Sequence, residues 1–160
     1  AEASHWLAAD RSGGEMPFYQ GASVALAPYQ KAGQFHTFTH NSTPAPGVQA
    51  LSIQGHTPGH TGFRVRSDGE SLFFWGDVVH NLALQFADPQ ISVDFDLDMK
   101  KARLARSKAL QDAARTGEWV AGAHMPFPGI GQVLPAGKNS FRWQPVDYSR
   151  ALPNTSQSAQ

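Results

Sequence analysis

The sequence predicts a mixed α/β fold, built as one domain or as part of one. Three observations support this prediction. The chain has 160 residues, which is about the size of one domain. Short β-type runs separated by turn residues recur from residue 35 onward. A single long amphipathic pattern at 98–116 lies between them and is typical of a helix.

The first part of the chain predicts two helices followed by two strands. A short helix is expected at 2–10, before the Ser-Gly-Gly break. A second is expected at 18–31, where Pro28 interrupts the last turn of an Ala-rich run. Alternating residues at 35–40 predict a strand, and a Pro-Ala-Pro-Gly turn leads into another at 48–53.

The second part predicts one long helix among further strands. The helix 98–116 has Asp98 as its expected N-cap and Gly117 just past its end. Its residues expected to face a core are Met99, Ala102, Ala109, Leu110 and Ala113. The expected strands are a hairpin of 63–66 and 71–75 around Ser-Asp-Gly-Glu, a short buried strand at 119–123, and a final hairpin of 130–134 and 141–146.

Composition excludes several classes of function. Lys+Arg and Asp+Glu number 13 each, so the chain lacks the net charge that attracts nucleic acid or an anionic membrane. No apolar run approaches the roughly 20 residues of a membrane span, and the first residues do not resemble a signal peptide. Without cysteine there is no disulfide, thiolate zinc site or cysteine nucleophile. Any metal must be held by His, Asp or Glu.

Three segments share one form, in which a strand ends in glycine and a metal-ligand side chain follows. They are 55–61, with His60, then 75–77, with Asp77, and 121–126, with His124. Glycine lets the backbone turn sharply there, so that ligands from separate loops can converge at the edge of a sheet. Imidazole and carboxylate suit zinc, manganese or iron. Each residue alone has a structural alternative, in a turn or in packing, but the ordered set favours a metal site.

The remaining histidines divide by context. His56 lies four residues before His60, but Pro58 prevents this segment from forming a helix turn that would place both histidines on one face. His56 is therefore expected to brace its loop or to support a ligand. His80 follows Asp77 by three residues, and both a position in the cleft and one at its rim stay open. His5, His36 and His40 lack a ligand-like context and are assigned to surface or strand positions.

The three motifs, Thr57-Pro58-Gly59-His60-Thr61, Phe74-Trp75-Gly76-Asp77 and Gly122-Ala123-His124, closely resemble the later motifs of the metallo-β-lactamase superfamily of hydrolases. The runs 124–129, 77–80 and 85–87 resemble its branch of bacterial lactonase-like and organophosphate-hydrolase-like enzymes. The resemblance implies an αββα sandwich, with two sheets packed face to face between helices. It implies that His60 completes a three-histidine metal site, that Asp77 bridges two metals and that His124 belongs to the second site.

The family's first motif, His-x-His-x-Asp-His, supplies most of its metal ligands and does not occur in this chain. The resemblance therefore implies that residues 1–150 are the C-terminal portion of a single metallo-β-lactamase-like domain, followed by a frayed polar tail at 151–160. The N-terminal part of the same protein would carry the remaining ligands. A natural three-ligand protein is the alternative.

The function implied by this resemblance is that of a dinuclear metal-dependent hydrolase. Two divalent ions, zinc before manganese or iron, would activate a hydroxide that attacks an ester, lactone or phosphotriester. Asp77 would be catalytic, as the bridge that orients the nucleophile, and the 160-residue chain alone would be weakly active or inactive. Residues expected to line a small-molecule pocket are Phe86, Met125, Phe127 and Ile130, with core packing as the alternative.

Two other functions stay open at this point. One is a non-catalytic binding or assembly protein of the same fold with an incomplete metal site, and the other is a thioester hydrolase or oxidoreductase of the same superfamily. A homodimer is a further expectation. The resemblance suggests a bacterial protein. Its compartment stays open between periplasm and cytoplasm, because the absence of cysteine fits either one.

Overall fold

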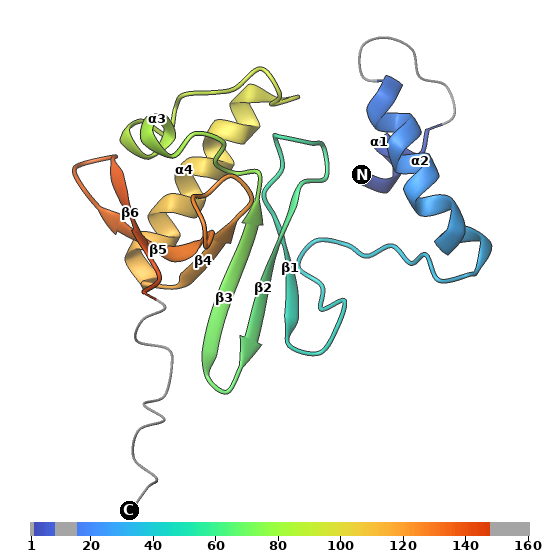
Figure 1. The fold of residues 1–160 in the computed structure, drawn as a ribbon, viewed down its shortest axis with the longest axis horizontal. Coiled ribbons are helices and arrows are strands. Elements are labelled where there is room, and N and C mark those ends of the chain that lie inside the picture. The colour runs from blue at the N-terminus through green and yellow to red at the C-terminus, as the bar shows by residue number, and fades with distance from the viewer. Residues whose placement is uncertain (1, 9–15, 148–160) are drawn as a thin grey trace, which may run out of the picture.

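A six-stranded mixed sheet forms the centre of the molecule (Figure 1). The computed structural model describes residues 2–8 and 16–147. The strands follow one another across the sheet in chain order: β1 (Val48–Ser52), β2 (Thr61–Ser67), β3 (Glu70–Gly76), β4 (Trp119–Gly122), β5 (Ile130–Pro135) and β6 (Phe141–Pro145). The helices are α1 (Glu2–Trp6), α2 (Met16–Lys31), α3 (Leu82–Ala87) and α4 (Met99–Thr116). Strands β3 and β4 pair in parallel, and the other neighbouring pairs are antiparallel.

Most of the elements expected from the sequence are confirmed. Both hairpins, the strand after α4 and the strand before β2 occur close to their expected bounds. Helix α2 continues through Pro28 to Lys31. Helix α1 ends at Trp6, earlier than the expected 2–10: residues 7 and 8 are not helical, and residues 9 and 10 lie outside the described residues. The tail expected at 151–160 also lies outside them.

The strand expected at 35–40 is wrong. Residues 34–39 have no regular secondary structure, because no neighbouring strand offers them a ladder of hydrogen bonds. Pairing with β1 begins only at Asn41, whose backbone N–H donates to the carbonyl of Ala50 at 2.7 Å, and ends at Ser42, whose carbonyl accepts from the Ala50 N–H at 2.9 Å. Alternation alone is therefore not enough to place a strand.

Helix α4 has the ends that the sequence predicts. The Asp98 carboxylate accepts from the backbone N–H of Lys101 at 3.0 Å, and Gly117 adopts the left-handed conformation with φ 69°. Ala102, Ala109, Leu110 and Ala113 are buried as expected. Met99 is 42% exposed instead, because the core cluster contacts the C-terminal half of α4, about 15 Å further along the helix.

The core fills the space between α3, α4 and one face of the sheet. Side chains from the sheet that belong to it are Phe73, Trp75, Val120 and Val133, and Leu110 of α4 is fully buried against them. Figure 1 shows α3 and α4 on this side, with α1 and α2 standing apart from the sheet.

The opposite face of the sheet, called the open face below, is apolar. Alternation along the paired strands assigns to it Val48, Ala50, Phe63, Val65, Leu72, Phe74, Trp119, Ala121, Ile130 and Leu134. Ala50, which pairs with the segment at Asn41 and Ser42, is fully buried; the other side chains keep some solvent exposure, and Phe74 is 42% exposed. Among the described residues, no helix combines the length and apolar character needed to cross a bilayer.

Candidate metal centre

Three loops meet at one end of the sheet. Strand β1 runs antiparallel to β2, and β2 runs antiparallel to β3, so β1 points the same way as β3 and β4. The C-terminal ends of these three strands therefore lie together. The loops that leave them carry His56 and His60, then Asp77 and His80, and finally His124. The sheet topology thus brings together the segments that the sequence singled out.

Asp77 and His124 form the closest pair in this group. The Oδ1 of Asp77 lies 2.9 Å from Nε2 of His124, and the two side chains are 35% and 47% exposed. The ring of His80 stacks on that of His124, with centroids 4.7 Å apart and an interplanar angle of 27°. One ligand atom from each of Asp77, His80 and His124 lies within 4.8 Å of the others.

His60 reaches the same region but already uses both ring nitrogens. Its Nδ1 lies 3.1 Å from the carbonyl of Ile53, and its Nε2 accepts from the backbone N–H of Asp77 at 3.2 Å. Burial lowers the pKa of His60, and the neighbouring His56 lowers it further. A neutral ring with Nδ1–H donating to Ile53 satisfies both contacts. His60 belongs to neither of the two candidate ligand groups among the described residues.

Gly76 makes this arrangement possible. Its φ is +55°, a left-handed conformation that side-chain-bearing residues adopt reluctantly. A Cβ at this position would lie 2.8 Å from Nε2 of His60. Glycine therefore serves both the turn after β3 and the close approach of the histidine, as the strand–glycine–ligand pattern predicts.

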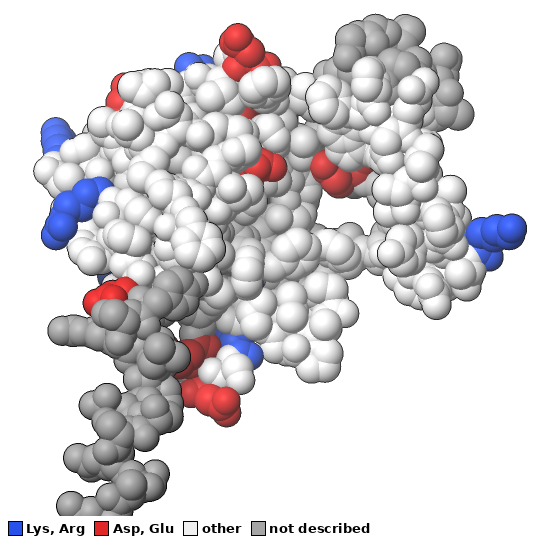
Figure 2. Space-filling view, viewed as in Figure 1, with Lys and Arg blue, Asp and Glu red and all other residues white. Residues whose placement is uncertain are grey.

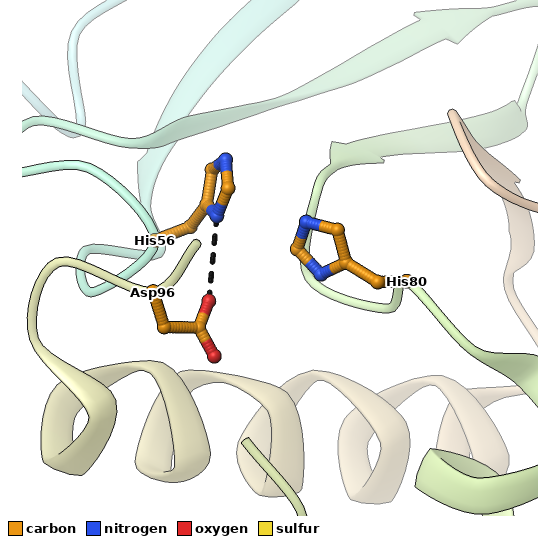
Figure 3. A group of neighbouring side chains, drawn as sticks. All are labelled: His56, His80 and Asp96. Atoms are coloured by element: carbon orange, nitrogen blue, oxygen red, sulfur yellow. Dashed lines mark hydrogen bonds and ion pairs between the residues drawn. The ribbon is translucent and has the colours of Figure 1, made fainter. Parts of the chain in front are cut away.

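A buried ion pair lies beneath the site. Nδ1 of His56 is 3.3 Å from Oδ1 of Asp96, and Nε2 of His56 is 3.7 Å from Oδ2 of Asp77. Oδ2 of Asp96 accepts from Nη2 of Arg106 at 3.2 Å, and neither side chain of this ion pair is more than 1% exposed. Figure 3 shows His56 joined to Asp96, with His80 facing them from the neighbouring loop.

Arg106 ties the loops of the site to α4. Its Nε donates to the Val78 carbonyl at 2.8 Å, and its Nη1 donates to the carbonyls of Pro89 and Ile91 at 3.2 and 2.6 Å. Burial lowers the pKa of the guanidinium, and Asp96 opposes that shift. The sequence did not lead us to expect a role for Arg106 or Asp96. A usable signal was the charged Arg106 at a core position of the α4 stripe, four residues after Ala102 and three before Ala109.

His80 is held from below by a buried glutamine. The Oε1 of Gln85 accepts from the backbone N–H groups of His80 and Asn81 at 2.7 and 3.1 Å. Gln85 lies on α3, a helix that the sequence reading missed; Asn81 is its N-cap. Burial lowers the pKa of His80, followed by the charges of His56 and His124. Its Nδ1 is buried without a hydrogen-bond partner in the described part of the chain.

The four expected pocket residues divide between surface and core. Phe127 is 94% exposed on the loop that follows His124, and Ile130 lies on the open face. Phe86 and Met125 are 3% and 8% exposed and belong to the hydrophobic core, which is the alternative that the sequence left open.

A cavity of about 770 Å³ separates α1 and α2 from the sheet. Trp6, Leu26, Phe38, His40, His60 and Phe63 are among its lining residues. Figure 2 shows an opening between the N-terminal helices and the rest of the chain, with acidic side chains in red at its upper border. Nε2 of His40 lies 3.1 Å from Oγ1 of Thr61, so His40 links the segment before β1 to β2.

The donor set fits a divalent transition metal. Two imidazoles and a carboxylate are ligands that suit zinc, iron or manganese. A buried imidazole nitrogen without a hydrogen-bond partner, such as Nδ1 of His80, is a further mark of a polar site that a bound group would complete.

Comparison with known proteins identifies the family. The hydrolase AbOPH of the beta lactamase superfamily is 36% identical in sequence to this chain over an alignment that covers 91% of this chain and 53% of AbOPH, with a TM-score of 0.82. The chain belongs to the metallo-β-lactamase superfamily. No protein-family model matches the chain, and no curated protein matches its sequence.

Two further solved structures resemble this chain in fold. AidC, described as a dizinc quorum-quenching lactonase, is 23% identical over 91% of this chain, with a TM-score of 0.79. A probable metal-dependent hydrolase from Staphylococcus aureus is 17% identical over 71% of this chain, with a TM-score of 0.57. The chain spans 53%, 52% and 41% of these three structures, about half of their length. The predicted fold class is thereby confirmed.

Proposed function

We propose that the protein containing this chain is a metal-dependent hydrolase, with Asp77 and His124 among its metal ligands. One observation carries the proposal: a carboxylate and an imidazole from two loops lie 2.9 Å apart at the end of the sheet, in a chain 36% identical to a hydrolase of this superfamily. We further propose two zinc ions in the intact protein, bridged by Asp77. His60 would complete a three-histidine site whose other ligands come from the part of the fold outside this chain.

A metal ion bound here would lower the pKa of a coordinated water and polarise a carbonyl or phosphoryl oxygen. The residues of the chain orient and hold the ligands. Oδ2 of Asp77 faces His56, which Asp96 and Arg106 support from below. Residues of this kind behind a ligand fix its direction and raise metal affinity. With a metal bound, the Asp77 carboxylate would be one of the groups that hold it, and the contact with His56 would fix the direction of this side chain.

The exposed ring of Phe127 favours a substrate with an apolar portion. Phe127 presents almost its whole ring to solvent, three residues after His124. An exposed aromatic ring beside a polar site is typical of a substrate contact. Esters, lactones and phosphotriesters meet this description, and each has an electrophilic centre for water to attack.

The test is hydrolysis by the full-length protein that contains this chain. A neutral aryl phosphotriester, an N-acyl lactone and an aryl acetate serve as substrates, before chelation, after chelation and after zinc is restored. We expect at least one substrate to be hydrolysed, with loss on chelation and recovery with zinc. No turnover in the presence of zinc, or turnover that survives chelation, contradicts the proposal.

A pair of variants ties the activity to the site. Asp77→Asn keeps the shape of the side chain but removes its charge, so kcat should fall by roughly 100-fold or more. Asp94→Asn, at an exposed position before the buried Asp96, is the matched control and should leave kcat within about twofold. Equal kcat in both variants would show that Asp77 is not part of the catalytic site.

A further inference from the structure

We propose that the 160-residue chain by itself holds one divalent transition-metal ion at Asp77, His80 and His124, with His80 as a ligand. This inference deepens the proposed function, because it concerns the same site. It assigns to His80 a bond to the metal that the family pattern does not give it. In this chain His80 would take the place of ligands that the rest of the fold supplies in the intact protein.

The three proposed ligand residues lie close together. The ligand atoms of Asp77, His80 and His124 lie within 4.8 Å of one another, and the Asp77–His124 pair lies at 2.9 Å. Zinc binds nitrogen and oxygen at about 2.0–2.2 Å, so tetrahedral ligands around it lie roughly 3–3.5 Å apart. Small side-chain rotations are enough to reach this spacing. Two histidines and one carboxylate, with room for water, form a set that suits zinc or iron.

His80 is held in place, while its Nδ1 has no hydrogen-bond partner among the described residues. Gln85 is fully buried; it accepts from the backbone N–H of His80, and its amide donates to the Ile91 carbonyl at 3.0 Å. The loop is therefore built to keep His80 where it is. Its ring stacks on His124, yet its Nδ1 is buried without a hydrogen-bond partner among the described residues. Such a group costs free energy unless something binds the ring.

Other residues near the site are less suited to hold the metal ion. In this structure both ring nitrogens of His60 are engaged, by the Ile53 carbonyl and the Asp77 backbone N–H. His56, His80 and Asp96 form the other candidate group. There the Asp96 carboxylate is already paired with Arg106, and a second cation beside that guanidinium is electrostatically unfavourable. The set of Asp77, His80 and His124 has neither obstacle.

The experiment titrates the metal-free 160-residue chain with Co²⁺, followed by visible absorption, and with Zn²⁺ by competition against a chelating dye. His80→Ala is compared with the control His36→Ala, at an exposed position away from the loops. We expect one equivalent to bind. His80→Ala should raise Kd by at least roughly tenfold, while His36→Ala stays within about threefold of the wild type. Circular dichroism checks that each variant folds.

A second readout does not depend on the variants. The ring nitrogens of His80 and His124 should shift in long-range ¹H–¹⁵N spectra of the wild-type chain as zinc is added, whereas those of His60 keep their metal-free shifts. Three results would overturn the inference: no binding by the wild-type chain, unchanged affinity in His80→Ala, or zinc-induced shifts in His60 without shifts in His80. Zinc-dependent hydrolysis by the complete protein would persist in each of these cases if only this inference, and not the proposed function, is wrong.

Discussion

At the residue scale, Asp77 has a different partner for each of its carboxylate oxygens. Oδ1 lies near Nε2 of His124 and Oδ2 near Nε2 of His56. Its backbone N–H donates to His60. Asp77 therefore connects all three loops of the site. A small structural change beside it should shift the side chains of all three loops.

Gly76, directly before Asp77, allows a sharp test of this close packing. We expect Gly76→Ala to destabilise the chain more than Gly69→Ala. Both glycines have positive φ, 55° and 82°, so both substitutions carry a left-handed strain of about 1–2 kcal/mol. A Cβ at Gly76 also collides with His60 Nε2, whereas nothing lies within 4 Å of a Cβ at Gly69. Urea unfolding of the two variants measures the difference, and equal losses would show that His60 moves away freely.

Two partly buried histidines, His60 and His80, predict how stability depends on pH. Burial lowers the pKa of His60 and of His80 below the ordinary value of 6.5. The unfolded chain then binds more protons than the folded chain once the pH falls below about 6.5, so folding becomes less favourable. The lowered pKa values of Asp98 and Asp112, caused first by hydrogen bonds from Lys101 and Lys108, act below about pH 4 and lie outside this window.

The measurement is the free energy of unfolding of the metal-free chain at pH 7.5, 6.5 and 5.5, with a chelator present. It should fall toward pH 5.5. The double variant with His60→Gln and His80→Gln should show a flatter profile. Stability that stays constant or rises over this range contradicts the assigned burial of the two rings.

At the element scale, α4 supports the loops as well as the core. Its apolar residues pack on the sheet, while Arg106 crosses the same stripe to hold three loop carbonyls and Asp96. Arg106→Met removes one partner of a buried ion pair, and we expect a loss of about 3–5 kcal/mol in unfolding free energy. Lys108→Met, on the exposed side of the same helix, breaks only a surface pair with Asp112 and should cost no more than about 1 kcal/mol.

Chemical denaturation of the two variants checks this prediction. A loss below about 1 kcal/mol in Arg106→Met would mean that the loops hold their positions without the guanidinium. Zinc affinity measured on the same variant adds a second comparison. It should weaken, because Asp77 and Val78 belong to one loop.

Some helices and strands could be predicted from the sequence and others could not. The hairpins, α4 and the strand–glycine–ligand segments were predictable, because turn residues, caps and periodicity act locally. The segment 35–40 was misjudged, because whether an alternating run becomes a strand depends on a partner elsewhere in the fold. Helix α3 has six residues, too few for a helical period to show. Asp96 and Arg106 were missed, because their roles come from contacts between loops far apart in sequence.

At the scale of the whole molecule, the sheet has one covered face and one open apolar face. The chain spans about half the length of the structures that it matches. We therefore expect the open face to pack against the part of the fold that lies outside this chain. Apolar surface of this extent binds hydrophobic dyes or drives self-association when it is left uncovered.

Phe74→Lys tests this expectation, because Phe74 is 42% exposed on the open face. The variant should bind less of a hydrophobic fluorescent dye and should self-associate less than the wild-type chain. Leu104→Lys is the control, at a residue that is 62% exposed on α4, and should change neither property as much. Light scattering with dye fluorescence measures both. A wild-type chain that binds no dye and stays monomeric would contradict an uncovered apolar face.

We propose that the loops after β1, β3 and β4 build a metal centre. Anomalous diffraction at the zinc edge, from crystals of the chain grown with zinc, tests this proposal. We expect an anomalous peak within about 2.0–2.2 Å of Asp77 Oδ1 and His124 Nε2. Crystals that bind zinc only at other sites, or that leave these two residues in direct contact without a peak, would contradict it.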